Sequence, residues 1–299
     1  MTMVRGPVHN SRMRTPSLPQ KRNLTARRSS LAAAFIAVTL AVTFATNANA
    51  GPIEDAYLAY TRGDYATALK LFVPLAEQGN RDAEYSVGVI YSNGRGLPQS
   101  YVEAAKWFHR AADKGQAGAQ YDLGVLYAKG QGVPADLAEA AKWFRKAADQ
   151  GKANAQYNLG YMYSQGQGVG QDYAEAARWF RKAADQGDMD SQNRLAALYL
   201  GGDGVQQDYA EAARWYRKAA DQGDIEAQNE LGSLYGNGQG VSQDYVEAYR
   251  WFDIAASRPV SGDFETHDNA VRNRDLVAGK MTPAQIAEAQ KLFKAWKPN

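Results

Sequence analysis

Tryptophan returns along this chain at a fixed interval of 36 residues, at Trp107, Trp143, Trp179, Trp215 and Trp251. Glycine keeps the same step, at Gly79, Gly115, Gly151, Gly187 and Gly223. Self-similarity at such a period is the signature of repeat architectures, in which each unit buries its apolar face only against its neighbours. This spacing restricts the possible folds more than any other feature of the sequence.

The first half of each repeat has the pattern of an amphipathic helix. In the unit from Ala153 to Gly187, the residues Ala155, Leu159 and Met162 fall on one helical stripe. The stripe ends at the stretch SQGQGV, whose two glycines tolerate backbone angles that other residues resist. We expect one helix here, followed by a reversal of the chain.

The second half begins with its own start pattern, Asp172 followed three residues later by Glu175. This pair predicts a capping box, in which each side chain satisfies a backbone N–H of the helix start, and Gly187 predicts the helix end. Trp179 is expected at the edge of the apolar stripe, whose members are Tyr173, Ala176, Ala177, Phe180, Ala183 and Ala184. The expected solvent face comprises Arg178, Arg181, Lys182 and Asp185.

Two short antiparallel helices bury too little apolar surface to be stable alone, so the units must stack on one another. The sequence therefore predicts an all-α fold, an α-solenoid of antiparallel helix pairs with a 36-residue period and a C-terminal capping helix.

The repeat also contains a recognisable motif: Leu–Gly and Tyr in the first helix, GxGV in the turn, the Asp/Glu start, then AxxWxxxAA and a final glycine. It resembles the Sel1-like repeat family, relatives of the tetratricopeptide repeats, from about Asp55 to Pro259. The resemblance implies a right-handed solenoid that serves as a scaffold or adaptor for other proteins. The fourth unit departs from the motif at Ala196, where the other units have glycine, and in its turn, LGGDGV.

Outside the repeats, Ala56 to Gly79 has a shortened, tetratricopeptide-like pattern with its turn at Gly63 and Asp64. Thr282, followed by Pro283, predicts the start of a last helix. The expected organisation is a signal peptide at 1–50, an N-terminal capping helix pair at 51–79, five Sel1-like repeats at 80–259 and a linker with C-terminal capping helices at 260–299. The repeats are expected at about 80–115, 116–151, 152–187, 188–223 and 224–259.

The first fifty residues hold seven cations and no acid, and removing them leaves 27 cations against 32 acids, a net charge of −5. A basic start, the apolar run from Leu31 to Thr46 and small residues at Ala48 and Ala50 predict a secretory signal peptide cleaved after Ala50. A membrane anchor is the alternative, although 16 uncharged residues are fewer than the roughly 20 that span a bilayer. We expect an exported, periplasmic protein with no membrane span after cleavage; secretion from the cell is the other possible outcome of export.

Few residues suggest chemistry. The chain contains no cysteine, and only His109 and His267 follow the predicted signal peptide, so neither a thiolate site nor a histidine-rich metal site is expected. We interpret His109 as a solvated surface residue. The turn glycines complete no phosphate-binding motif, and the recurring acids already serve as helix caps. The sequence predicts no enzyme, no cofactor, no metal and no nucleic-acid partner.

One side of the first helix varies from repeat to repeat while the frame stays constant, which is typical of a recognition surface for another protein. Unconstrained drift of surface residues is the alternative. A second hypothesis is an envelope factor that binds glycan, in polysaccharide secretion or at peptidoglycan, or hydrolyses it. The candidate protein-binding residues are Asp122, Val125, Lys129, Asn154, Asn158, Tyr161, Gln165, Asp190, Arg194, Glu226 and Glu230.

Overall fold

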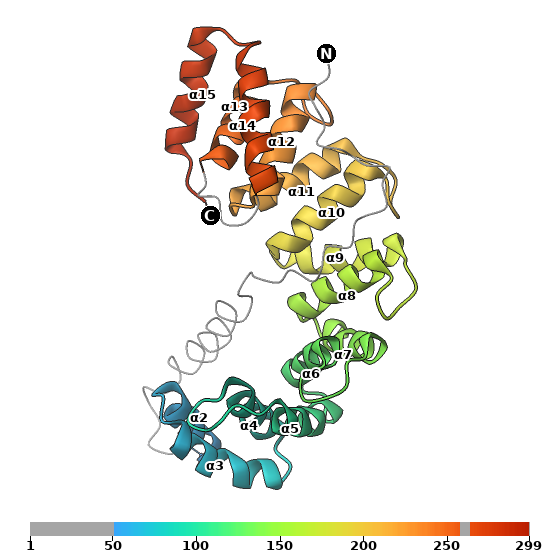
Figure 1. Cartoon of the computed structure of the whole chain (residues 1–299), viewed down its shortest axis with the longest axis vertical. Coiled ribbons are helices and arrows are strands. Elements are labelled where there is room, and N and C mark those ends of the chain that lie inside the picture. The colour runs from blue at the N-terminus through green and yellow to red at the C-terminus, as the bar shows by residue number, and fades with distance from the viewer. Residues whose placement is uncertain (1–50, 258–263, 299) are drawn as a thin grey trace. The chain divides into compact units, whose positions relative to one another are not determined.

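The computed structural model describes residues 51–257 and 264–298, which form fourteen α-helices and contain no strand (Figure 1). The all-α prediction is therefore confirmed. The predicted signal peptide at 1–50 and residues 258–263, where the fifth predicted repeat meets the predicted linker, lie outside the described residues. The helices are α2 (Pro52–Thr61), α3 (Tyr65–Glu77), α4 (Arg81–Asn93), α5 (Tyr101–Asp113), α6 (Ala117–Lys129), α7 (Leu137–Asp149), α8 (Ala153–Gln165), α9 (Tyr173–Asp185), α10 (Met189–Gly201), α11 (Tyr209–Asp221), α12 (Ile225–Asn237), α13 (Tyr245–Ala256), α14 (Phe264–Ala278) and α15 (Pro283–Ala295).

The helices fall into two compact units, and the chain passes from the first unit to the second within α7, between Ala147 and Ala148. We name the first helix of each repeat helix A (α4, α6, α8, α10 and α12) and the second helix B (α5, α7, α9, α11 and α13). Helices A and B of one repeat pack directly on each other, as α8 does on α9 and α10 on α11.

A glycine in helix A and an aromatic ring in helix B determine how closely the two helices of a repeat approach each other. A Cβ atom added to Gly160 would lie only 2.9 Å from two ring carbons of Phe180. Gly88, Gly124 and Gly232 face Phe108, Phe144 and Phe252 in the same way. In the fourth repeat the position is Ala196, and helix B there carries Tyr216 in place of phenylalanine.

The turns between helices A and B require glycine at one position for two reasons. In Gly204 the backbone is left-handed, with φ +66°, which side chains other than that of glycine adopt at a cost. A Cβ atom at this position would also lie 2.2 Å from the carbonyl carbon of Tyr173 in the preceding helix B. The turn thus brings its backbone against the start of helix B in the previous repeat, whereas the sequence predicted only the reversal of the chain.

The expected capping boxes at the start of helix B are only half formed. The side chain of Asp172 accepts a hydrogen bond from the backbone N–H of Glu175 at 3.0 Å, as predicted. The Glu175 carboxylate does not return to the helix start, because it pairs with Arg178 at 2.6 Å, one turn further on. The complete reciprocal box among the described residues lies at α15, between Thr282 and Gln285.

Four of the five repeated tryptophans are more deeply buried than the sequence indicated, and the exception, Trp107, is half-buried. Trp179, expected at the edge of the apolar stripe, is 4% exposed, and Trp215 is 1% exposed. The indole Nε1 of Trp215 donates a hydrogen bond to the Glu211 carboxylate at 3.2 Å. This glutamate at the helix start thus accepts from the indole and not from the backbone N–H that a capping box would use. Lys218 lies 4.1 Å from the centre of the same ring. The ammonium group itself lies over the indole ring, in the geometry of a cation–π contact.

A second contact ties each helix A to the helix B before it. The side chain of Gln192 in α10 donates to the backbone carbonyl of Ala184 in α9 at 3.2 Å, and Gln228 in α12 repeats this with Ala220 in α11 at 3.0 Å.

In the first repeat the corresponding residue is Glu84, which is fully buried. Its Oε1 accepts from Arg110 Nε at 2.9 Å and from Lys114 Nζ at 2.8 Å.

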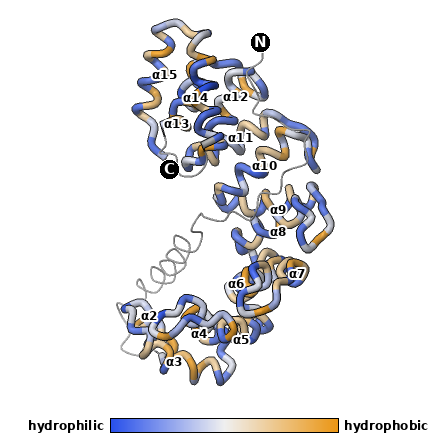
Figure 2. The backbone as a smooth tube through the Cα atoms, in the orientation of Figure 1, coloured by the Kyte–Doolittle hydropathy of each residue, from blue (hydrophilic) through white to orange (hydrophobic). Residues whose placement is uncertain are grey.

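The two ends of the described chain differ from the repeats. At the N-terminal end Gly63 has a left-handed backbone and Asp64 caps α3, whose long hydrophobic stretch is visible in Figure 2. At the other end α14 begins at Phe264, earlier than the position near Asn269 that the sequence suggested. From α15, Ile286, Phe293 and Trp296 pack on the buried residues of the second unit, which closes the face of α13.

Candidate functional site

In three repeats a side chain of helix B contacts aromatic rings of the following repeat, and we call these contacts the ladder; the side chains are His109, Arg181 and Arg217. In the second unit the guanidinium of Arg181 donates to the hydroxyl of Tyr199. It lies 5.5 Å from the centre of the Tyr199 ring and 5.8 Å from that of Trp215. Arg217 makes the same contacts with Tyr235 and Trp251 one repeat later. The prediction that Arg181 belongs to a purely solvent-facing side was wrong, because its charge is used between repeats.

His109 occupies the same ladder position in the first unit. Its Nε2 lies 3.0 Å from the hydroxyl of Tyr127, and its ring packs edge-on against Tyr127 and Trp143. The interpretation of His109 as a solvated surface residue was therefore wrong. The imidazole replaces the longer guanidinium as the link to the next helix pair.

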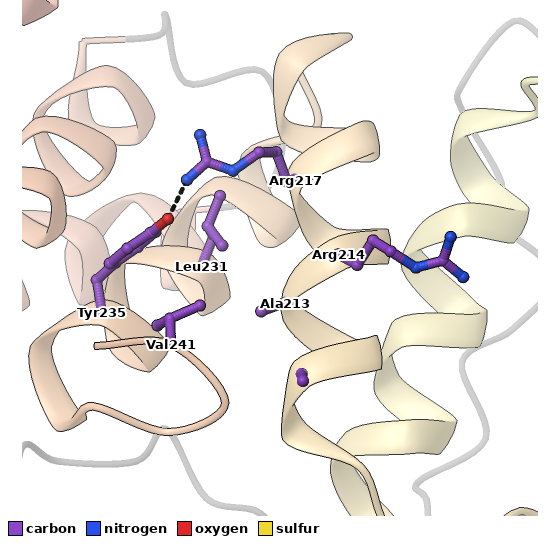
Figure 3. Close-up of a pocket in the computed structure, with 7 residues that line it drawn as sticks. Ala213, Arg214, Arg217, Leu231, Tyr235 and Val241 are labelled. Carbon is purple, nitrogen blue, oxygen red and sulfur yellow. Dashed lines mark hydrogen bonds between the residues drawn. The ribbon is translucent and has the colours of Figure 1, made fainter. Parts of the chain in front are cut away.

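A small pocket lies beside this ladder in the second unit (Figure 3). Its volume is about 180 Å³, below the roughly 300 Å³ at which sites for drug-sized ligands begin. Arg217 reaches over Leu231 to Tyr235, whereas the side chain of Arg214 points away from them. The pocket is a gap in the packing of α11 against α12, and its lining offers no set of catalytic groups.

The candidate residues lie on four of the helices A, namely α6, α8, α10 and α12. In α8, Tyr157 and Tyr161 stack with their ring centres 6.5 Å apart. Burial raises the pKa of Tyr157, while a hydrogen bond with Arg194 from α10 acts in the opposite direction. This contact connects α8 to α10, the helix A of the next repeat.

Farther along the same unit the surface becomes polar. Asn193 in α10 donates to the carboxylate of Glu226 in α12 at 2.9 Å. Asn229 in α12 accepts from Asn273 in α14 at 3.2 Å. Both Asn193 and Asn229 are more than nine-tenths buried, so amide groups form the floor of the surface here.

In the first unit the corresponding floor is aromatic. Burial, followed by the charge of Asp122 and a hydrogen bond with it, raises the pKa of Tyr85 well above its usual value. Val125 and Lys129 lie farther along α6, with Val125 half-buried and Lys129 exposed.

In the second unit, Arg194 and Glu226 are exposed among the candidates. The half-buried ones are Asn154, Asn158, Tyr161, Gln165, Asp190 and Glu230.

The sequence identified the candidate residues of helix A but missed one further position, which we call the floor position. The floor position reads Tyr85, Tyr121 and Tyr157, then Asn193 and Asn229, one residue per repeat. Because three copies are tyrosine, the position looks like part of the frame. The change to asparagine in the last two copies was the available signal.

Neither a metal centre nor a membrane span is found in the described part of the chain. Among residues 51–257 and 264–298, no group of three histidine or acidic side chains converges to hold a metal ion. In the same ranges, no helix combines the length and apolarity needed to cross a bilayer.

Helix pairs stacked at a fixed period, linked by the ladder and carrying a variable surface on one helix, define an α-solenoid repeat protein. The family model described as Sel1 repeat matches residues 81–116, 117–152, 153–188, 190–224 and 225–259. The chain belongs to the Sel1 repeat family, as its motif indicated. Repeats of this family generally mediate protein interaction, and the fold is typically non-catalytic.

Two of the solved structures that are similar to this chain are also related to it in sequence. One is c5321, a protective antigen present in uropathogenic Escherichia coli strains and displaying an SLR fold; it is 36% identical, with a TM-score of 0.67. The match covers 82% of this chain and 52% of the antigen, so this chain spans about half its length. The other is a Sel1 repeat protein from Oxalobacter formigenes, 29% identical with a TM-score of 0.67, matched over 77% of this chain and 100% of that one. No curated protein matches the sequence.

Proposed function

We propose that this protein is a non-enzymatic scaffold or adaptor of the bacterial cell envelope that binds another protein through the helix A surface. The observation that carries the proposal is the contrast between the two helices of a repeat. Helix B keeps nearly the same sequence in each copy, YAEAARWFRKAAD in α9 and YAEAARWYRKAAD in α11. Helix A changes its outward residues in every copy, from Asn158 and Tyr161 in α8 to Arg194 and Ala197 in α10.

The contacts of the two helices support this division of roles. The cations of helix B are largely occupied by their own chain, since Arg178 pairs with Glu175 and Arg181 reaches the next repeat. On helix A the stacked pair of Tyr157 and Tyr161 presents aromatic surface beside charged residues. Rigid aromatic side chains ringed by polar groups are frequent anchors in protein interfaces.

Photo-crosslinking tests the proposal. We would place a benzophenone amino acid at Tyr161 on helix A and, as a matched control, at Gln290, which is exposed on α15. We expect a discrete adduct in periplasmic extract from the Tyr161 position, and its loss when Asn158→Lys is added to a protein with an unchanged melting curve. An adduct from Gln290 alone, or a Tyr161 adduct insensitive to Asn158→Lys, contradicts binding through the helix A surface.

The envelope location rests on the N-terminal sequence. A basic start followed by an apolar run and small residues supports export by the secretory route. N-terminal sequencing of the protein from a periplasmic fraction should find Gly51 as the first residue. Recovery of the uncleaved chain from the cytoplasm argues against it, and recovery from the membrane favours the anchor.

A further inference from the structure

The ladder shows how one repeat receives a cation from the repeat before it. Arg217 of α11 donates to the hydroxyl of Tyr235 in α12 (Figure 3). Its guanidinium lies 5.4 Å from the centre of the Trp251 ring, and its Nη2 lies 3.9 Å from the carboxylate of Glu247. A hydroxyl, an indole ring and a carboxylate of one repeat thus surround one guanidinium, and we call such a set of three groups a rung.

The first repeat carries the same three residue types at the same positions of its two helices. We call them the first rung, and they are Tyr91 in α4 and Glu103 and Trp107 in α5. The Tyr91 and Trp107 rings pack against one buried apolar cluster. The side chain of Glu103 is 40% exposed, so its carboxylate is open to a partner from outside. All three residues lie within the first unit.

The helix that precedes the first rung brings a valine to it where the ladder has longer polar side chains. Val73 in α3 lies 36 residues before His109, and it packs against the same buried cluster as Tyr91 and Trp107. Trp107 is only half-buried, whereas Trp143, which His109 contacts, is 4% exposed. The first indole of the series is therefore the one that solvent reaches.

The cation that already lies over Trp107 comes from its own helix and occupies a different place. The guanidinium of Arg110 lies 4.5 Å from the centre of the Trp107 ring, and its charge is balanced by a buried carboxylate. Lys218 holds the same position on Trp215, at 4.1 Å, while Arg181 of the preceding helix B lies 5.8 Å from that ring. One indole thus accommodates both cations, so Arg110 leaves room for a second one at Trp107.

We propose that the first rung binds an arginine side chain of another protein. The incoming guanidinium donates to the Tyr91 hydroxyl, lies over the Trp107 ring and pairs with Glu103. Arginine suits the rung better than lysine, because its planar group stacks on a ring and donates hydrogen bonds at the same time. None of the three residues belongs to the candidate set on helix A, so the inference goes beyond the proposed function.

Peptide titration of the isotope-labelled full chain tests the inference. The probe is a glycine–serine peptide with one central arginine, and its matched control carries citrulline, which has the same shape without the charge. Trp107→Phe identifies the indole N–H signal of Trp107 in the NMR spectrum. We expect the arginine peptide to shift this signal, and the citrulline peptide to bind at least about tenfold more weakly.

Val73→Arg gives the decisive comparison, because it supplies the first rung with a guanidinium from within the chain, as Arg181 does for Trp215. It should weaken the arginine peptide at least about tenfold. Equal binding by wild type and a folded Val73→Arg variant, or equal binding of the two peptides, overturns the inference.

A second pair of variants decides the question if Val73→Arg does not fold. Glu103→Gln should weaken the arginine peptide about tenfold, because it removes the carboxylate that pairs with the guanidinium. Glu139→Gln removes the same carboxylate one repeat later and should leave the affinity unchanged. An unchanged affinity of Glu103→Gln, or an equal loss in both variants, overturns the inference.

The inference and the proposed function fail in different ways. If the Tyr161 crosslink captures a partner but the arginine peptide leaves the Trp107 signal in place, only the inference is refuted. If the peptide binds at the first rung but the crosslink captures nothing, only the proposed function is refuted. If the chain sediments as a dimer that Val73→Arg dissociates, a second copy supplies the arginine, and the assignment to another protein is overturned.

Discussion

Replacing Gly160 by alanine tests whether the close contact between helices A and B governs the stability of a repeat. The new Cβ would lie 2.9 Å from Cδ1 and Cε1 of Phe180 and 3.2 Å from the carbonyl oxygen of Ala176. Phe180 is 1% exposed, and its ring centre lies 5.9 Å from that of Tyr157, so the ring has little room to move away. The Ala176 oxygen belongs to the backbone of α9 and cannot turn aside.

Two effects of opposite sign decide the result. Overpacking of a filled core costs about 1–3 kcal/mol. Alanine in a helix interior is favoured over glycine by about 1 kcal/mol. The contact distances of Gly160 place it among the tight cases, so we expect a net loss of about 1 kcal/mol in the free energy of unfolding. In the fourth repeat, where alanine is native, Ala196→Gly should also destabilise, by about 1 kcal/mol, because no clash is relieved there.

Urea unfolding followed by far-UV circular dichroism measures both changes. A double variant, Gly160→Ala with Phe180→Leu, provides the internal control, because the smaller leucine side chain lacks the aromatic ring and should relieve part of the clash. Its cost should be less than the sum of the two single costs. An increase in the free energy of unfolding for Gly160→Ala would refute the steric argument and leave helix propensity as the governing effect.

Three further results are expected. Trp215→Ala should lower the free energy of unfolding by about 3–5 kcal/mol in urea titration, and Trp107→Ala by less, because Trp107 is only half-buried. His109→Arg should raise stability by about 0.5–1 kcal/mol in a melting experiment, since arginine holds this ladder position in later repeats; a lower melting temperature contradicts that role. Hydrogen bonds from Thr67 lower the pKa of Asp64 below 3.8, so its contribution is present above that value and is lost as the pH falls through the lowered pKa. Asp64→Asn should flatten the acid limb of the stability–pH curve, and an unchanged limb argues against the cap.

The frame of the fold could be predicted because its causes are local. A turn glycine, a helix-start aspartate and a tryptophan each act within a few residues, and their period exposes them to direct comparison. The same reasoning failed for Arg181 and His109, whose partners Tyr199 and Tyr127 lie 18 residues further along the chain. A sequence pattern shows that a residue is charged and lies on the polar side of an amphipathic helix. It does not show which aromatic ring of the next repeat the residue contacts.

The candidate surface was predictable only in outline. Its outer residues vary between repeats and so attract notice, whereas Tyr216 differs from its counterparts by a single hydroxyl group. Phenylalanine and tyrosine are equivalent in a hydrophobicity pattern. The fourth repeat also differs from the others at Ala196 and in its turn, LGGDGV.

Near-identical repeats can pack out of register during folding. A helix pair displaced by one repeat still contacts alanines, an indole and a glutamine at the equivalent positions. Glu84 removes that freedom at the start of the array. If α4 were displaced by one repeat, its fully buried carboxylate would leave Arg110 and Lys114 behind, at the several kcal/mol that an unpaired buried charge costs. Glu84 therefore distinguishes the first repeat from the later ones. Folding intermediates in which α4 packs one repeat out of register are destabilised at the N-terminal end.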